Sequence, residues 1–443
     1  MSQIKIDKHK KYKFPHTIML VKYIDKYLVI APKYANWIVL ESAYQLLVFD
    51  FLRKGHTIGD TVKSFNKEDV ELVVCQLEAR KFCNKKIYSI VETERSMHLY
   101  LTNKCNLLCP HCYMYSGLSS QDELSTEQLM LLLYNYKTIA NGVNLTISGG
   151  EPTSRADCIP IIKYASELGL NVKLLTNGIL LSVMDIDEMS KYIGSVQISI
   201  DGFSEESNAI IRGKRHFQKA LDSMDAFIRN GVETSVAITP TYPILKQHVN
   251  DYVIFAKQLV DKYADKNFCV KFTENLSVGR EVNLSIIENA EYTNLVKSIQ
   301  TEIYGYEQDF IHFVQTMSKN IIVDNCMFGV FAIASNGDVY LCPEIGKLHP
   351  VANVKNDSFK DILQKAIEAE EATLVSRLRP CKNCELRYIC GGGCRIEEFP
   401  SVTEIKSFKG VKIGDILPRK CNYKIKEKFY DLMIKSNEYL YEI

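Results

Sequence analysis

Three cysteines lie close together in the sequence, at Cys105, Cys109 and Cys112, with the spacing Cys-x3-Cys-x2-Cys. They follow directly on an apolar run near residue 97 that predicts a β-strand. Thiolates are soft ligands that suit iron–sulfur clusters, and three of them on one loop can bind three irons of a [4Fe–4S] cube. The fourth iron then has no protein ligand and is open to a small molecule. Structural zinc is the alternative, but it requires four protein ligands, and no fourth lies nearby in the sequence.

A second set of cysteines stands near the C-terminus with the spacing of a metal site. The chain contains 14 cysteines. It begins without an apolar signal segment, which predicts a reducing cytoplasm where cysteines bind metals rather than form disulfides. The four central members of the set could form a zinc ribbon, which stays open as an alternative. The set comprises Cys326, Cys342, Cys381, Cys384, Cys390, Cys394 and Cys421. Four isolated cysteines are expected to be buried thiols, namely Cys75, Cys83, Cys158 and Cys269.

A glycine pair and a carboxylate follow the second predicted strand, in the segment Ser148 to Pro152. Gly149 and Gly150 would let the backbone approach a ligand closely. Glu151 can accept hydrogen bonds from an ammonium group. Such a turn is ordinary by itself, but its place at a second strand end, after the three cysteines, favours a binding site.

Together these features resemble the radical S-adenosylmethionine (SAM) superfamily. The resemblance implies that the open iron chelates SAM, and that one electron cleaves SAM to a 5′-deoxyadenosyl radical, which abstracts a substrate hydrogen. His111 stands where this family usually has an aromatic residue that packs on adenine. A turn cap at Asn177 and a surface role for Arg212 are the structural alternatives for two of the implied contacts. The implied SAM-binding residues are Gly149, Gly150, Glu151, Thr176, Asn177, Ser199, Asp201 and Arg212.

The seven C-terminal cysteines, with the Gly391 to Cys394 segment, resemble the SPASM domain, which carries two auxiliary [4Fe–4S] clusters and so brings the expected total to three. The proximal cluster would be one ligand short, and water, Glu344 or a substrate thiolate could complete it. Auxiliary clusters would accept the electron that the substrate loses. By this resemblance the distal ligands are Cys381, Cys384, Cys390 and Cys421, and the proximal ligands are Cys326, Cys342 and Cys394.

Length and hydrophobic periodicity indicate how these residues are positioned. The chain has 443 residues, of which 46% are apolar and 24% charged, with a net charge of +1. This balance points to neither nucleic acid nor a membrane surface as a partner. Strands are expected near residues 97, 143, 171, 195, 233 and 267, with helices between them, for example over 125–140 and 217–231. The fold class is therefore α/β, with a partial (β/α)6 TIM-like barrel over 93–305 and the SPASM domain over 306–443.

Residues 1–92 predict a winged-helix-like α+β domain. Strands are expected over 14–24, 26–32 and 36–41, and helices over 42–55, 57–65 and 66–82, followed by a polar linker over 84–95. The pattern resembles a RiPP recognition element, which binds the leader of a ribosomally made, post-translationally modified peptide. The leader would add as a strand to the third strand, with the third helix as the groove wall. A DNA-binding winged helix is the rival, which the acidic residues of the helices disfavour.

The leading hypothesis is therefore a cytoplasmic peptide maturase that takes a hydrogen from a precursor peptide and closes a crosslink, with a Cys thioether as the first choice. A carbon–carbon or carbon–oxygen link, and a sulfatase-maturase-like dehydrogenation of Cys or Ser, are the alternatives. A non-catalytic electron carrier is disfavoured by the SAM motifs. The partners would be the precursor peptide and an electron donor such as flavodoxin or ferredoxin. No catalytic base is assigned: Asp338 has a structural interpretation, and Gly279-Arg280 is expected to be a packing or positioning site.

Overall fold

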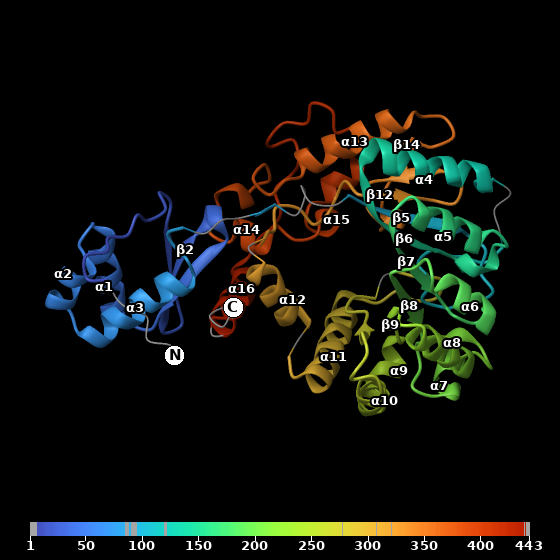
Figure 1. The fold of residues 1–443 in the computed structure, drawn as a ribbon, viewed down its shortest axis with the longest axis horizontal. Helices are drawn as coiled ribbons and strands as arrows, with labels where there is room; N and C mark the ends of the chain where they lie inside the picture. The colour runs from blue at the N-terminus through green and yellow to red at the C-terminus, as the bar shows by residue number, and fades with distance from the viewer. Residues whose placement is uncertain are drawn as a thin grey trace.

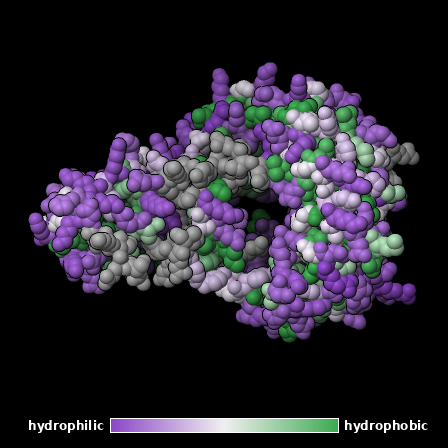
Figure 2. Space-filling view, viewed as in Figure 1, coloured by the Kyte–Doolittle hydropathy of each residue, from purple (hydrophilic) through white to green (hydrophobic). Residues whose placement is uncertain are grey.

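The computed structural model describes residues 7–84, 88–89, 95–118, 122–276, 278–306, 308–319, 321–437 and 439. The N-terminal region lies at one end of the molecule and the barrel at the other, with C-terminal segments between them (Figure 1). Figure 2 shows a hollow near the centre of this view, beside the barrel. Among the described residues, no helix has the length and apolar character needed to cross a membrane.

The N-terminal region is a three-stranded antiparallel sheet with three helices. Side chains of Ser42, Thr57 and Asn66 accept hydrogen bonds from the first turns of the helices and fix where each begins. The first strand is shorter than the sequence predicts and starts after Pro15, which has no N–H to donate to a ladder. The elements are β1 Met19–Tyr23, β2 Lys26–Ala31, β3 Asn36–Leu40, α1 Ala43–Arg53, α2 Ile58–Ser64 and α3 Lys67–Ala79, with a 3-10 turn η1 at Pro32–Tyr34.

Both faces of this sheet are buried. One face packs on its own helices through residues such as Val29 and Ile38. The other packs on the C-terminal region through residues such as Leu28 and Trp37. Because side chains alternate between the faces of a strand, a sheet covered on both sides requires a nearly continuous apolar run. All five residues of β3 are accordingly buried.

Side chains of and next to α3 bond the outer edge of β3, the strand to which the leader peptide is expected to add. The Val39 N–H donates to Gln76 Oε1 at 2.8 Å, and Gln76 Nε2 donates back to the Val39 carbonyl. Arg80 Nε donates to the Trp37 carbonyl at 3.2 Å. The sequence predicted that this helix forms the groove wall, but it could not show that the Gln76 side chain bonds the backbone of the strand. A peptide could add to β3 only by displacing them.

The barrel region contains six parallel strands in sequential order, which confirms the predicted α/β fold. The strands are β5 Arg95–Thr102, β6 Gly142–Gly149, β7 Asn171–Thr176, β8 Ser195–Ser199, β9 Glu233–Ile238 and β10 Phe268–Phe272. The helices are α4 Thr126–Ala140, α5 Cys158–Glu167, α6 Val183–Met189, α7 Glu205–Arg212, α8 Phe217–Arg229, α9 Tyr242–Gln247, α10 Val249–Lys262 and α11 Ile286–Tyr304, with η2 at Pro152–Ser154.

The C-terminal region extends the barrel sheet. Strand β12 (Phe331–Ile333) pairs in parallel with β5, and β13 (Asp338–Tyr340) and β14 (Ala352–Asn353) continue the sheet antiparallel. These strands have two or three residues, too few to give a periodic signal. A separate pair joins β11 (Ile321–Ile322) to β4 (Tyr88–Ser89). The rest of the predicted linker at 85–87 and 90–94 lies outside the described residues. The remaining elements are α12 Gln308–Ser318, η3 Ile345–Lys347, α13 Phe359–Ala372, η4 Cys381–Asn383, α14 Arg387–Cys390, α15 Arg395–Glu398, η5 Pro400–Glu404 and α16 Tyr423–Lys435.

Candidate active site

The three cysteines of the first motif share one loop after β5. Cys109 is buried, and Cys105 and Cys112 are half-buried around Leu107 and Ile179. Burial is the main cause that raises the pKa of the Cys109 thiol to about 11, against the opposing effect of the Arg212 charge. A thiol in such a place resists ionisation unless a cation takes the proton's position. The loop therefore brings the three thiols together in an environment that favours metal binding over free thiolates. We name residues 105–117 the cluster loop.

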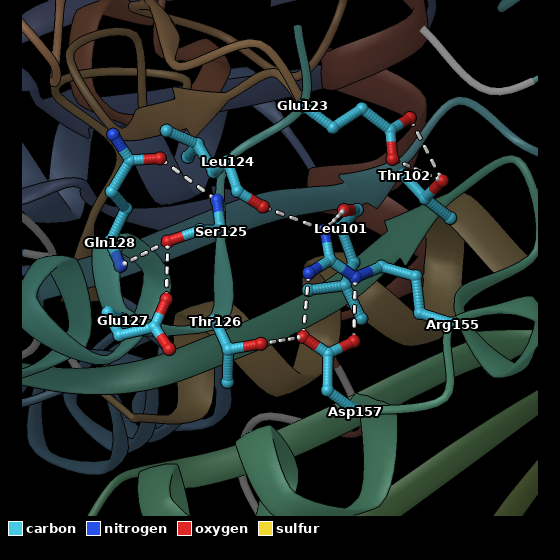
Figure 3. Close-up of polar contacts among 10 residues, drawn as sticks. All are labelled: Leu101, Thr102, Glu123, Leu124, Ser125, Thr126, Glu127, Gln128, Arg155 and Asp157. Carbon is cyan, nitrogen blue, oxygen red and sulfur yellow. Dashed lines mark hydrogen bonds and ion pairs between the residues drawn. The ribbon is translucent and has the colours of Figure 1, made fainter. Parts of the chain in front are cut away.

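A carboxylate fixes the start of the cluster loop. Glu123 accepts hydrogen bonds from the Thr102 hydroxyl at 2.9 and 3.0 Å (Figure 3). It also accepts one from the Asn103 N–H at 2.7 Å. The Cys105 N–H donates to the Gly117 carbonyl, which closes the loop. The end of β5 and the two ends of the loop are thus one hydrogen-bonded unit.

A bidentate ion pair braces the strand behind this unit. The Arg155 guanidinium donates to both oxygens of Asp157 at 2.8 and 2.7 Å, and its Nη1 also reaches the Leu101 and Leu124 carbonyls (Figure 3). The Arg155 hydrogen bonds lower the pKa of Asp157 from 3.8 to about 2. The sequence analysis missed this brace, because Arg155 and Asp157 stand close in sequence and resemble an ordinary surface pair.

The glycine pair is required by close backbone contact with the residues that lead into the cluster loop. A side chain on Gly150 would stand 2.3 Å from the Lys104 carbonyl oxygen, and one on Gly149 would stand 2.4 Å from that of Thr102. The backbones instead bond directly, with the Gly150 N–H donating to Thr102 and the Glu151 N–H to Lys104, each at 2.8 Å. The Gly-Gly-Glu segment is therefore locked beside the cluster loop.

Glu151 is buried and already accepts several hydrogen bonds. Its Oε1 accepts from the Thr153 N–H and hydroxyl and from the Thr176 hydroxyl at 2.7 Å, whereas Oε2 accepts only from the Asn177 N–H at 2.7 Å. A carboxylate oxygen has room for two donors, so Oε2 can take one more. Asn177 also donates from Nδ2 to Asn106 of the cluster loop at 2.8 Å. Thr176 and Asn177 thus orient Glu151 and tie it to the cluster loop.

Asp201 lies behind Arg212 and is bonded by protein groups through both of its oxygens. Its side chain is fully buried, with Oδ2 accepting from Arg212 Nε at 2.6 Å and Oδ1 accepting from the Thr239 N–H at 2.8 Å. His111 Nε2 lies 3.4 Å from the same Oδ2. Asp201 therefore orients Arg212 and lies within reach of His111 beside the cysteines. Ser199, at the end of β8, is half-buried.

Arg212 and His111 face the cysteines. The charge of Arg212 acts on Cys109 and Cys105. Burial lowers the pKa of His111, and among the described residues its Nδ1 is buried without a hydrogen-bond partner. A cation and an orphaned nitrogen beside the three thiols fit a polar, carboxylate-bearing ligand such as SAM.

The Gly279-Arg280 segment clamps the cluster loop from the far end of the barrel. A side chain on Gly279 would stand 2.6 Å from the His111 carbonyl carbon. The Gly279 carbonyl accepts from the Tyr115 hydroxyl at 3.1 Å, and Arg280 donates to the Ser116 carbonyl. The segment therefore has the packing and positioning place that the sequence suggested.

Four of the C-terminal cysteines line one cavity of about 380 Å³. Arg419 and Lys426 line it as well. Helix α16 forms one wall, and it follows directly on the last cysteine of the set. The cavity has the size, the soft ligands and the neighbouring cations that an anionic iron–sulfur cube needs. The four cysteines are Cys381, Cys384, Cys390 and Cys421.

The other three are Cys326, Cys342 and Cys394. Burial and then the neighbouring thiols of this group raise the pKa of Cys342 and of Cys394. Cys326 and Cys394 are exposed, and burial raises the pKa of Cys342 to about 12. Glu344 is close to Cys342, and its carboxylate lies 3.8 Å from Lys347 Nζ. Within the described ranges, no three His, Cys, Asp or Glu side chains converge on a single metal ion. A cube binds each sulfur at a different iron, so its ligands stand farther apart than those of one ion.

Sequence reasoning missed the charged residues around these cysteines. Arg395 follows Cys394 directly, Arg419 precedes Cys421 by two, and Glu385 follows Cys384. Glu385 is buried and accepts from Lys426 Nζ at 2.7 Å and from the Tyr430 hydroxyl. Their positions next to cysteines could have indicated a role at the cluster sites. Charged residues near a predicted loop are, however, normally solvated.

Two family descriptions match this chain. Residues 99–253 match the Radical SAM superfamily, and residues 325–385 match SPASM, an iron–sulfur cluster-binding domain.

Similar proteins cover most of the chain. The sporulation killing factor maturation protein SkfB of Bacillus subtilis (strain 168) is 26% identical over 319 residues, covering 70% of this chain and 73% of SkfB. The mycofactocin maturase MftC of Mycolicibacterium smegmatis is 27% identical, covering 68% of this chain and 77% of MftC. The PqqA peptide cyclase of Bradyrhizobium diazoefficiens is 25% identical, covering 68% of this chain and 81% of the cyclase. A solved structure, native anSMEcpe with bound AdoMet, has a TM-score of 0.55 at 20% identity, covering 78% of this chain and 99% of that one, and shows a shared fold.

Proposed function

The chain is a radical SAM enzyme with a SPASM domain, and from this premise we propose that it matures a ribosomally made peptide. It removes a hydrogen atom from a precursor peptide and closes an intramolecular crosslink, with a Cys thioether as the first candidate. One observation carries this proposal: relatives that align over about 70% of the chain are named as a maturation protein, a maturase and a peptide cyclase. The cyclase favours ring closure, without saying which atoms are joined.

The cluster loop and the polar strand ends bind SAM in this proposal. Cys105, Cys109 and Cys112 hold the first [4Fe–4S] cluster, which together with SAM supplies the radical that takes the substrate hydrogen. Arg212 binds the SAM carboxylate, since its guanidinium already faces the thiols. Glu151 accepts a hydrogen bond from the SAM ammonium through its less occupied Oε2. Asp201 holds Arg212 in place.

The seven C-terminal cysteines hold two further clusters, for a total of three, which supply an acceptor for the electron that the substrate loses. Cys381, Cys384, Cys390 and Cys421 give the distal cluster four ligands. Cys326, Cys342 and Cys394 give the proximal one three. The fourth ligand position of the proximal cluster is open to Glu344, water or a substrate thiolate. Because the Glu344 carboxylate already pairs with Lys347, water or a substrate thiolate can compete with it for this position.

The N-terminal region binds the leader of the precursor in this proposal. The groove between β3 and α3 is the place where an extended strand would find unpaired partners once Gln76 and Arg80 move away. Exposed reduced cysteines require a reducing compartment, so we place the enzyme in the cytoplasm, with a flavodoxin- or ferredoxin-type protein as the electron donor.

The test is reaction of the reconstituted enzyme, without oxygen, with SAM, a reductant and a candidate precursor encoded beside it. We expect 5′-deoxyadenosine and a peptide lighter by two hydrogens per link. A Cys109→Ala variant is the control and should form neither product. Cleavage of SAM with no change in the mass of any candidate peptide would contradict the proposal.

A further inference from the structure

A fully buried arginine stands between the two groups of C-terminal cysteines. Arg395 has no exposed surface. Its Nε donates to the Thr373 carbonyl at 2.8 Å, its Nη1 to the Gly391 and Gly393 carbonyls at 2.9 and 2.6 Å, and its Nη2 to the Asp324 carbonyl at 3.2 Å. The guanidinium is therefore held rigidly by four backbone groups.

All four of these acceptors are neutral. Among the residues that the structure describes, Arg395 forms no ion pair with a carboxylate. A buried charge strongly destabilises the folded protein unless an opposite charge compensates it. An anion must therefore complete this environment.

The charged groups that act on Arg395 are cysteine sulfurs from both cluster sites: Cys326 and Cys394 of the proximal group, and Cys381 and Cys390 of the distal group. The position that a side chain on Gly392 would occupy is 3.1 Å from Arg395 Nη1 and 3.6 Å from Cys381 Sγ, so both atoms border one small space. Arg395 is also held by backbone carbonyls of Asp324, two residues before Cys326, and of Gly391 and Gly393, between Cys390 and Cys394, so it lies beside cysteines of both groups.

Arg419 gives an internal contrast. Its Nη1 lies 3.8 Å from Cys390 Sγ, and its Nε lies 3.1 Å from a Glu398 oxygen. The sulfurs that act on its charge, those of Cys390, Cys421 and Cys381, all belong to the distal group. Arg419 therefore has a carboxylate partner and faces a single cluster site, whereas Arg395 has none and faces both.

We propose that Arg395 is the shared counter-charge of the two auxiliary clusters and raises the reduction potential of both. This inference rests on the proposed cysteine assignment but not on the identity of the peptide. A cluster held by thiolates is anionic and becomes more so when it gains an electron, so a fixed cation in a low-dielectric site favours the reduced form. Arg395 is a positioning and tuning residue, because it touches no substrate.

The charge of Arg395 would assist the electron transfer that follows bond formation in the substrate. When a thioether closes, the substrate carbon radical and the thiol form the C–S bond, the thiol proton goes to solvent, and one electron reduces one auxiliary cluster. An oxidised one-electron carrier protein takes that electron later. Arg395 makes the first transfer more favourable at either cluster, so the electron does not return to the peptide.

The experiment is a redox titration followed by electron paramagnetic resonance. It uses the reconstituted full chain with the three cluster-loop cysteines replaced by alanine, so that only auxiliary clusters contribute. A Cys326→Ala variant assigns the two signals. Arg395→Gln removes the charge, Arg395→Lys keeps it, and Arg419→Gln is the matched control.

We expect Arg395→Gln to lower both reduction equilibrium constants about tenfold, which is about 59 mV for a one-electron couple. Arg395→Lys should leave both potentials near those of the parent, and Arg419→Gln should lower the distal potential alone. A shift of only one potential, or of neither, in Arg395→Gln would overturn the proposal.

Loss of clusters in Arg395→Gln would not remove the test. In that case Arg395→Lys decides: unchanged potentials support the counter-charge, and a drop of both shows that hydrogen bonding rather than charge sets them. Iron analysis separates this result from failure of the proposed function. A parent without auxiliary clusters would refute the cysteine assignment, whereas an intact parent that modifies no peptide would refute only the maturase proposal.

Discussion

The cluster loop and the C-terminal cysteine groups use the same ligands but are built in different ways. The cluster loop sits at the end of a long strand in a large sheet and is held by backbone bonds, a glycine pair and the Glu123 carboxylate. The C-terminal groups lie among very short elements and depend on buried charges and on packing against the N-terminal sheet. The first site is thus formed by the fold in advance. The C-terminal site is completed by the clusters that bind to it and by the N-terminal sheet that packs on it.

The largest effect is expected from a substitution that disturbs the preformed cluster loop. Gly150→Ala should lower SAM cleavage about 100-fold, because the new methyl group meets the Lys104 carbonyl and shifts the cluster loop. Gly346→Ala is the control, since nothing lies within 4 Å of its added carbon. The measurement is the rate of 5′-deoxyadenosine formation by reconstituted protein. Equal rates in both variants would show that the glycine pair does not position the loop.

The dependence of the second site on docking can be tested at Trp37. Its indole N–H donates to the Met433 carbonyl of α16 at 3.1 Å, and its ring packs 5.7 Å from that of Phe313. Trp37→Phe should cost about 2 kcal/mol of docking free energy through the lost hydrogen bond and contact area. Because α16 forms a wall of the distal cavity, we expect the distal cluster to be lost faster to a chelator, with the cluster-loop cluster unaffected.

Equal loss from all three clusters, or from none, would mean that the N-terminal sheet does not support the distal site. Leu47→Ala is the matched control, since this exposed residue of α1 lies in the same region.

The brace behind the cluster loop predicts a pH dependence. The pKa of Asp157 falls from 3.8 to about 2 in the folded protein, so the ion pair contributes stability above pH 4 and loses it as the pH falls towards 2. Asp157→Asn should cost about 1–2 kcal/mol at pH 7 and flatten this loss. Chemical denaturation of cluster-free protein between pH 5 and 2 measures both. A variant as stable as the parent at pH 7 would contradict the brace.

The smallest expected effect concerns the closed edge of β3. Gln76 occupies the Val39 N–H and carbonyl that a leader strand would use. Gln76→Ala removes two bonds that a leader must break, and should therefore tighten leader binding about tenfold. Glu71→Ala, on the same helix, is the control. Fluorescence of Trp37, the one tryptophan of the chain, can report binding because Arg80 stacks 4.2 Å from its ring. Weaker binding in the Gln76 variant would place the leader elsewhere.

The sequence predicted the barrel well, because β-forming runs alternate regularly with helical segments, and each of the six expected strands is present. It could not predict that β12 extends the same sheet beside β5, since three residues carry no period. The spacing of the cysteines indicated which of them form groups that could bind clusters. It could not show that Arg212 bonds Asp201 or that Gln76 bonds the β3 edge, because only the folded chain brings these partners together.

The proposal of peptide maturation is tested most directly by following the hydrogen atom. A candidate precursor would be prepared with deuterium on its carbon positions and mixed with the reconstituted enzyme and SAM without oxygen. The account predicts that 5′-deoxyadenosine acquires one deuterium in the same reaction that yields the crosslinked peptide. Unlabelled 5′-deoxyadenosine, formed at an equal rate with and without the peptide, would contradict it.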